Sequence, residues 1–173
     1  MHRIIHRLIL AALVWMANPG HAQDFREDPA APASALNTMP KDPWTLTIAP
    51  YVHHWSKSPE HRHAFIVSLE QHQNAHRLYG MALFRNSFGQ PSAYAYAAYH
   101  QHGVLGNPRL SAKISAGLIY GYKGEYADKV PLNWHGYSPG LIPSLGYKVT
   151  EQDSVHIMLL GTAGFTLGYS HSF

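Results

Sequence analysis

Residues 163–173, AGFTLGYSHSF, alternate between two kinds of side chain over their whole length. A period of two is that of a β-strand, whose successive side chains point to opposite faces. One face carries bulky residues and the other carries small or polar ones, too slight to fill a protein core. The bulky set is Phe165, Leu167, Tyr169, His171 and Phe173, and the small set is Gly164, Thr166, Gly168, Ser170 and Ser172.

The same alternation recurs upstream. In residues 109–122 and 140–149, Leu, Ile, Ala, Tyr, Pro or Val alternates with Ser, Gly or Lys at most positions. Weaker alternation adds five further candidate strands, which brings the predicted number to eight. These are residues 44–55, 62–73, 76–86, 92–101 and 154–160.

An alternating apolar face can pack against a second sheet or face lipid. Three features favour lipid. Charged residues make up 13% of the chain, against about 25% in soluble domains. The predicted strands are long enough to cross a bilayer at a tilt, and aromatic residues stand near their ends, as in the aromatic girdle at a membrane interface. The sequence therefore predicts an all-β, eight-stranded antiparallel transmembrane up-and-down β-barrel over residues 44–173. The girdle residues are Trp44, Trp55, Tyr120, Tyr122, Tyr147 and Phe173.

The N-terminal part of the chain has a different composition. Residues 1–22 combine Arg3 and Arg7 with an apolar run of ten residues and a small residue at Ala22, which predicts a secretory signal peptide. Its removal leaves 11 basic against 10 acidic residues. Residues 23–43 contain four prolines and predict an extended segment. The expected location is the outer membrane of a Gram-negative cell.

Loop lengths give a second criterion, because such barrels have short periplasmic turns and longer outer loops. The alternation predicts periplasmic turns at residues 74–75, 102–108 and 150–153. It predicts outer loops at residues 56–61, 87–91, 123–139 and 161–162. The longest connection then lies outside, as expected.

Three segments are similar to one family of small barrels. They are residues 48–54 (IAPYVHH), 78–88 (LYGMALFRNSF) and 141–147 (LIPSLGY). They resemble the first, third and sixth strands of the PagP family, outer-membrane enzymes that move palmitate from a phospholipid to lipid A. The resemblance implies an acyltransferase whose substrates are phospholipid and lipid A. It also implies that the proline in residues 141–147, Pro143, loosens strand pairing so that lipid enters sideways.

The same resemblance implies the candidate catalytic residues. By its spacing from Ile48, His54 matches the family's histidine better than His53 does. Ser87 stands at the family's serine position, and Asn86 stands where the family has aspartate. Acyl transfer needs an activated hydroxyl, a base and oxyanion donors. His54 would be the base, Ser87 the nucleophile or an orienting hydroxyl, and Asn86 with loop amides the donors.

The acyl chain would occupy the lumen beside small residues. The candidate substrate-binding residues are Gly117, Pro143, Ser144, Gly146, Thr166 and Gly168. Two features depart from the family: Asn86 supplies no carboxylate, and residues 23–43 do not resemble the family's amphipathic N-terminal helix. Other segments, such as residues 117–133, resemble proteobacterial outer-membrane proteins whose activity is not established. The alternative is therefore a non-catalytic envelope barrel that binds lipid or a small solute or has a structural role.

The sequence also bears on cofactors, metals and partners. No phosphate-binding glycine loop or nucleotide fingerprint occurs, and there is no cysteine, so neither a cofactor nor nucleic acid is expected. His61 with His63, and His100 with His102, could each place two imidazoles on one strand face. The sequence fixes no further ligand nearby, so no metal site is predicted. We expect a monomer in the outer-membrane bilayer, recognised by the barrel-assembly machinery through the C-terminal aromatic residue Phe173.

Overall fold

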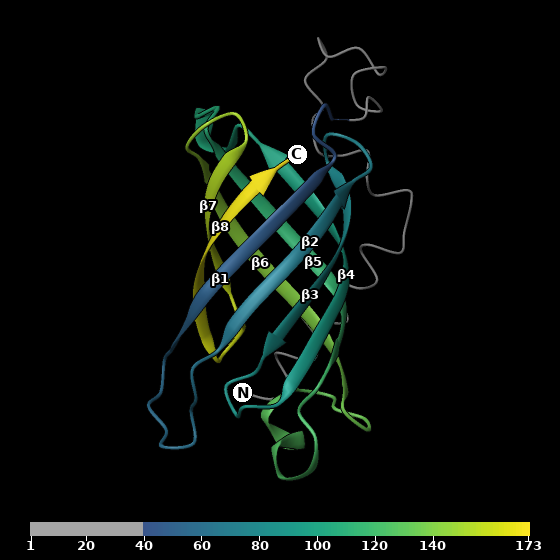
Figure 1. The fold of residues 1–173 in the computed structure, drawn as a ribbon, viewed down its shortest axis with the longest axis vertical. Helices are drawn as coiled ribbons and strands as arrows, with labels where there is room; N and C mark the ends of the chain where they lie inside the picture. Colours follow the sequence, from purple (N-terminus) through teal and green to yellow (C-terminus); the bar gives the residue numbers. More distant parts are fainter. Residues whose placement is uncertain (1–39) are drawn as a thin grey trace. The chain divides into compact units, whose positions relative to one another are not determined.

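The computed structural model describes residues 40–173. The predicted signal peptide and the Pro-rich segment, except for residues 40–43, lie outside the described residues. Eight strands follow one another around the barrel in Figure 1. They are β1 (Trp44–His54), β2 (Phe65–His72), β3 (Arg77–Arg85), β4 (Pro91–His102), β5 (Leu110–Tyr120), β6 (Tyr137–Lys148), β7 (Asp153–Leu159) and β8 (Gly164–Ser172). Within the described residues, no helix is long and apolar enough to cross a membrane.

The eight strands form one closed ladder. Each strand pairs antiparallel with the next, and β8 returns to pair with β1. The pairing of β1 with β8 continues past the end of β8, because Trp44 and Phe173 exchange backbone hydrogen bonds of 3.1 and 2.9 Å. Closure gives every strand two neighbours and leaves no free edge strand, although β1 with β2 and β6 with β7 are paired along only part of their length. The predicted eight-stranded antiparallel barrel is confirmed.

The two ends of the barrel differ. Residues 73–76, 103–109 and 149–152 form the short-turn end, and residues 55–64, 86–90, 121–136 and 160–163 form the long-loop end. This division agrees with the predicted turns and loops. The prediction was wrong at the start of β6, which begins at Tyr137 rather than residue 140. Tyr137 pairs with Tyr120 and bridges back to Trp134, so this hairpin continues further than the small-residue pattern indicated. The loop also holds a short 3-10 helix, η3 (Gly124–Lys129).

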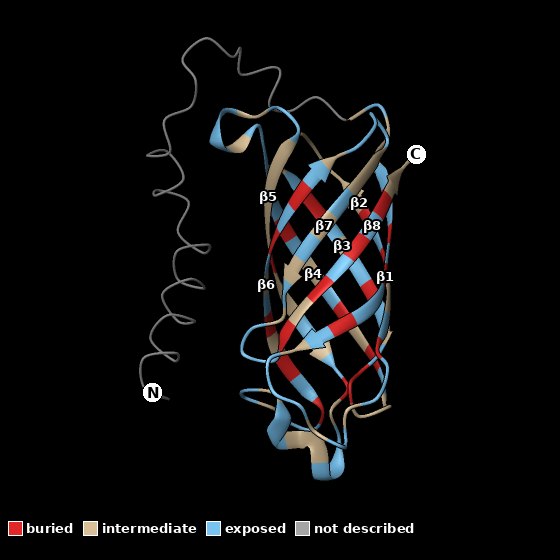
Figure 2. Ribbon diagram, turned by 90° about the vertical axis from the view of Figure 1, so that its left-hand side faces the viewer, coloured by how far each residue is buried: buried red, intermediate tan, exposed pale blue. Residues whose placement is uncertain are grey.

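The two strand faces separate as the alternation predicts. In β8, Leu167 is 60% exposed while the adjacent Thr166 is 1% exposed. Figure 2 shows buried and exposed residues alternating along the strands. The exposed side chains are mostly large and apolar, and the inward ones are mostly Ser, Thr, Gly and Ala. Such an outer surface suits hydrocarbon rather than water.

Five of the six predicted girdle aromatics are exposed, and Tyr122 is the exception. Tyr122 has a positive φ of 43°, and its ring meets Phe88 edge-on at 6.2 Å. Burial raises the pKa of the Tyr122 hydroxyl to about 12. The positive φ follows Gly121 and marks the end of the strand pattern, so Tyr122 packs among the loops instead of in the girdle.

Met81 provides a test of the lipid-facing surface. It lies at the centre of β3, is 54% exposed and has Leu69 and Ala95 as neighbours across the ladder. We expect Met81→Arg to lower the free energy of unfolding by about 2–4 kcal/mol in bilayers, the cost of a cation near the midplane. Met81→Leu is the control and should unfold like the parent chain in urea titrations. Equal stability of the two variants in bilayers would contradict a lipid-facing position.

Candidate functional site

A bulge in β1 decides which of two adjacent histidines faces the lumen. The register of β1 against β8 shifts between Ile48 and Tyr51, so Pro50 and Tyr51 both point outward. Before the bulge the odd-numbered residues face inward, and after it the even-numbered ones do. A one-residue slip moves every later side chain to the other face. His54 therefore turns inward, as the family spacing favoured.

His53 has the opposite orientation. Its ring lies on the outer surface, 4.9 Å from the Phe165 ring and 5.9 Å from the Trp55 ring. These contacts place His53 in the aromatic band at the long-loop end. It therefore lies on the outer face of β1, while the side chain of His54 turns to the inner face.

The structure brings His54 and Ser87 together. His54 Nε2 and Ser87 Oγ are 2.8 Å apart and hydrogen-bonded, although the residues are 33 positions apart in sequence. Ser87 is buried and His54 is half-buried, so the pair lies at the inward rim of the long-loop end. The ring of His61 lies 4.0 Å from that of His54 and covers it from the β1–β2 loop. An imidazole nitrogen on a serine hydroxyl is the arrangement that activates a nucleophile.

Asn86 is buried beside this pair but has a different set of partners. Its Oδ1 accepts hydrogen bonds from the backbone N–H groups of Phe88 and Gln90, each at 3.0 Å. Its Nδ2 donates to Ser92 Oγ at 3.1 Å. The amide thus organises the turn that carries Ser87, and within residues 40–173 it forms no hydrogen bond with His54 or Ser87.

Three loops meet around the Ser87 turn. The Arg62 N–H donates to the Ser87 carbonyl at 2.7 Å, which ties the β1–β2 loop to it. Gln90 and Lys123 exchange two hydrogen bonds of 3.0 and 2.9 Å, and Phe88 stacks on Tyr126 of η3 at 4.5 Å. The β5–β6 loop is therefore fixed to the same turn. The histidine–serine pair lies in a rim that several independent contacts hold in place.

Two breaks in the ladder flank this rim. Pairing of β1 with β2 ends at Ala49–Ile66, immediately before Pro50. Pairing of β6 with β7 ends at Ser144–Met158, immediately after Pro143, which points outward and is exposed. Proline has no N–H to donate to a neighbouring strand. The long-loop halves of β1 and β6 consequently each have a paired strand on one side only.

The predicted substrate-binding residues other than Pro143 face inward, but other side chains occupy the space beside them. A methyl group on Gly146 would come within 2.7 Å of the His156 ring, and one on Gly168 within 2.9 Å of Met158. Gly117 lies against the backbone of β4. The two hydroxyl residues are also engaged: Ser144 donates to the Lys113 carbonyl at 3.3 Å, and Thr166 donates to the Tyr51 carbonyl at 2.6 Å.

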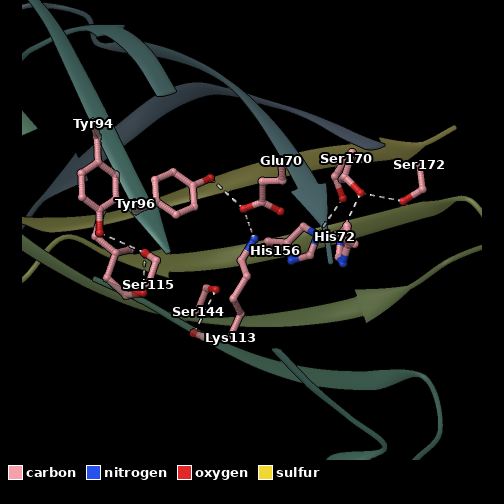
Figure 3. A network of polar contacts seen from close by, with 12 residues as sticks. Glu70, His72, Tyr94, Tyr96, Lys113, Ser115, Ser144, His156, Ser170 and Ser172 are labelled. Carbon is pink, nitrogen blue, oxygen red and sulfur yellow. Dashed lines mark hydrogen bonds and ion pairs between the residues drawn. The ribbon is translucent and has the colours of Figure 1, made fainter. Parts of the chain in front are cut away.

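The sequence reasoning missed a buried charge network in the lumen. Lys113 Nζ donates to Glu70 Oε1 at 2.5 Å, and Tyr96 Oη donates to the same oxygen at 2.7 Å. The side chains of Glu70 and Lys113 are 4% and 13% exposed. Figure 3 shows the three meeting from β2, β4 and β5. The sequence did indicate that Lys113 faces the lumen, because Lys113 stands among the small, inward-facing residues of its alternating strand.

Two tyrosines extend this network across the lumen. The rings of Tyr94 and Tyr96 stack at 4.7 Å. Tyr96 reaches Glu70 on β2, while Tyr94 Oη hydrogen-bonds Ser115 Oγ at 3.2 Å and the Gly140 carbonyl at 3.3 Å. Through these bonds one strand, β4, connects β2 to β6 across the barrel interior. Figure 3 shows the Tyr96–Glu70 and Tyr94–Ser115 contacts.

Metal ligands do not converge at this rim. Within residues 40–173, no group of three or more His, Asp or Glu side chains could hold a metal ion. The rim offers a hydroxyl, imidazoles and backbone amides. These are groups that acid–base and nucleophilic chemistry uses.

The fold defines a small barrel of the transmembrane type, with a histidine–serine pair at one rim. The chain is similar to a solved structure from work titled "De novo design of transmembrane beta-barrels", with a TM-score of 0.55 and 9% sequence identity. The match covers 79% of this chain and 100% of the designed one. At this identity the likeness establishes the fold alone. No protein-family model and no curated protein matches the sequence.

The buried ion pair leads to a stability prediction. Lys113→Met leaves the Glu70 carboxylate buried without its cation, so we expect the free energy of unfolding to fall by about 3–5 kcal/mol. Removing both charges, as in the Glu70→Gln/Lys113→Met variant, should cost less than the sum of the single changes. Urea unfolding of the four chains gives this double-mutant cycle. Additive losses would mean that the two charges do not interact.

The role of Asn86 in the turn leads to a second prediction. Asn86→Ala leaves two backbone N–H groups without their acceptor, which costs about 1–3 kcal/mol for each group that stays buried. Asn86→Asp keeps both acceptor bonds and should lose less. Thermal unfolding of the two variants in the same detergent compares them. A more stable alanine variant would show that the turn does not depend on this side chain.

Proposed function

We propose that this protein is an outer-membrane acyltransferase that moves an acyl chain from a phospholipid to lipid A at the outer leaflet. The observation that carries the proposal is the 2.8 Å hydrogen bond between His54 Nε2 and Ser87 Oγ at the inward rim. Imidazole suits the role of base, because its ordinary pKa lies near neutral pH. The resemblance of three segments to the PagP family supplies the reaction.

His54 Nε2 takes the proton of the attacking hydroxyl. That hydroxyl is either Ser87 Oγ, which gives an acyl-serine intermediate, or a lipid A hydroxyl that Ser87 orients. The oxygen attacks the ester carbonyl, the bond to the glycerol oxygen breaks, and His54 returns the proton to that oxygen. Where an acyl-serine forms, a lipid A hydroxyl then gives its proton to His54 Nε2 and attacks the acyl carbonyl, the bond to Ser87 Oγ breaks, and His54 returns the proton to Ser87 Oγ. Backbone N–H groups of the turn at residues 86–90 are the candidate oxyanion donors, because the Asn86 amide is already engaged.

The two ladder breaks support a lateral route for lipid. Next to Pro50 and Pro143, one neighbouring strand is not hydrogen-bonded, so opening there breaks no inter-strand bonds. The outer surface at both breaks is apolar, including Tyr51 and Leu141. An acyl chain could approach the rim from the hydrocarbon layer without crossing water.

The alternative is a non-catalytic envelope barrel that binds lipid or has a structural role. Two observations favour it: the Asn86 amide is engaged in the turn, and His156 and Met158 take the room beside Gly146 and Gly168. The first feature removes a donor for the oxyanion, and the second reduces the space for an acyl chain in the lumen. The two functions differ in whether a covalent product forms.

The catalytic proposal predicts a product that depends on the pair. The chain incubated with phospholipid and lipid A should yield lipid A heavier by one acyl group, measured by mass spectrometry. His54→Ala and Ser87→Ala should each lower its rate by at least about 100-fold, the smaller end of what a positioned acid–base group contributes. His53→Ala is the matched control and should keep the rate. No product from the parent chain, or equal rates in all variants, would favour the non-catalytic alternative.

A further inference from the structure

A second imidazole lies on the face of the candidate base. The ring centre of His61 is 4.0 Å from that of His54, and the two ring planes are inclined by 32°. The ring of Phe88 meets the His61 ring edge-on at 5.8 Å. The sequence offered His61 with His63 as a pair on one strand face, but the structure places both in a loop and separates them. The ring of His63 lies instead 6.2 Å from that of Tyr51.

Backbone hydrogen bonds of the β1–β2 loop hold His61 in this position. Its N–H donates to the Ser58 carbonyl at 3.1 Å. The N–H of the next residue, Arg62, donates to the Ser87 carbonyl at 2.7 Å. The loop that carries His61 is therefore tied to the same turn that carries the serine. His61 and His54 are both half-buried, so the two rings shield their facing sides from water.

The base lacks the acidic partner that stabilises an imidazolium in Ser–His–Asp sites. In the described part of the chain, no carboxylate forms an ion pair with His54, and Asn86 carries no charge. The neighbours that bear on the charge of this ring are the imidazoles of His61 and His53 and the backbone carbonyl of Ala163. Of the two imidazoles, His61 is the one whose ring is stacked on that of His54.

We propose that His61 is a positioning residue whose uncharged ring stabilises the imidazolium formed at His54, an inference that rests on the acyl transfer proposed above. A cation within about 6 Å of an aromatic ring centre is attracted to the face of that ring. His61 offers such a face at 4.0 Å when His54 takes the proton of the attacking hydroxyl. His61 itself exchanges no proton with the substrates. A protonated His61 would repel the imidazolium, so the uncharged form is the active one.

Three substitutions of His61 in the full-length chain test the proposal with phospholipid and lipid A. His61→Phe keeps an aromatic face and should keep most of the transfer rate. His61→Ala removes the face and should lower kcat by about 5- to 30-fold, the size of a cation–π contact shielded from water, with KM unchanged. His61→Arg should lower kcat further than His61→Ala, because it places a cation there. The control is His63→Ala, which changes an exposed histidine of the same loop and should keep the parent rate.

His61→Arg separates this role from packing alone. A planar guanidinium also stacks on aromatic rings, so a role limited to filling space predicts that His61→Arg behaves like His61→Phe. Equal rates in these two variants would overturn the proposal. The parent rate in His61→Ala would overturn it as well. The mobility of unheated samples on gels confirms that each variant is folded before the rates are compared.

A second measurement needs no lipid substrate. A long-chain alkyl fluorophosphonate labels an activated serine, and mass spectrometry gives the labelling rate of Ser87. This rate depends on proton transfer to His54, so it should fall in the order His61→Phe, His61→Ala, His61→Arg. Labelling in that order without any acylated lipid A would support the role of His61 and overturn the proposed acyl transfer. Absence of both labelling and product in the parent chain would overturn both.

Discussion

Closure of the ladder between β8 and β1 is the constraint on which the rest of this structure depends. It gives every strand two neighbours and fixes each strand side chain as inward or outward. An eight-stranded barrel has an interior just wide enough for side chains, so inward residues must be complementary in size. Tyr96 fits because Gly80 faces it, and Tyr94 fits because Gly140 does. A side chain at either glycine would occupy the space of the ring.

The bulge at Pro50 shows how a local irregularity controls the site. Without it, the alternation set by Thr45, Thr47 and Ala49 would turn His53 inward and His54 outward. One additional residue exchanges them and places the His54 imidazole on Ser87. The same proline ends the pairing of β1 with β2. The bulge at Pro50 is thus the common cause of two features: the inward orientation of His54, the candidate base, and the loss of pairing between β1 and β2.

The parts of the fold that could be predicted from sequence depend on local patterns. Alternation determines which residues form a strand and which face each presents, as in β8, and consecutive antiparallel strands make each strand's neighbours predictable. The ends of strands are less certain, because cross-strand pairs such as Tyr120 with Tyr137 decide them. The Glu70–Lys113 pair could not be predicted from the sequence, because contact between β2 and β5 across the lumen depends on the stagger of all the strands in the barrel. His54 and Ser87 were found through resemblance, and the stacking of His61 on His54 needed the three-dimensional structure.

The polar layer at the middle of the lumen separates the two ends chemically. Tyr96, Glu70 and Lys113 bond to one another, and Tyr94 continues the layer to β6. The His54–Ser87 pair lies at the long-loop end, and the imidazoles of His72, His100 and His102 lie at the short-turn end. Among the described residues the two groups share no hydrogen-bond or ring-stacking partner, and changes at sites without shared partners usually add. Substitutions among the imidazoles of the short-turn end and substitutions in the His54–Ser87 pair should therefore have independent effects, as long as the ion pair between them stays intact.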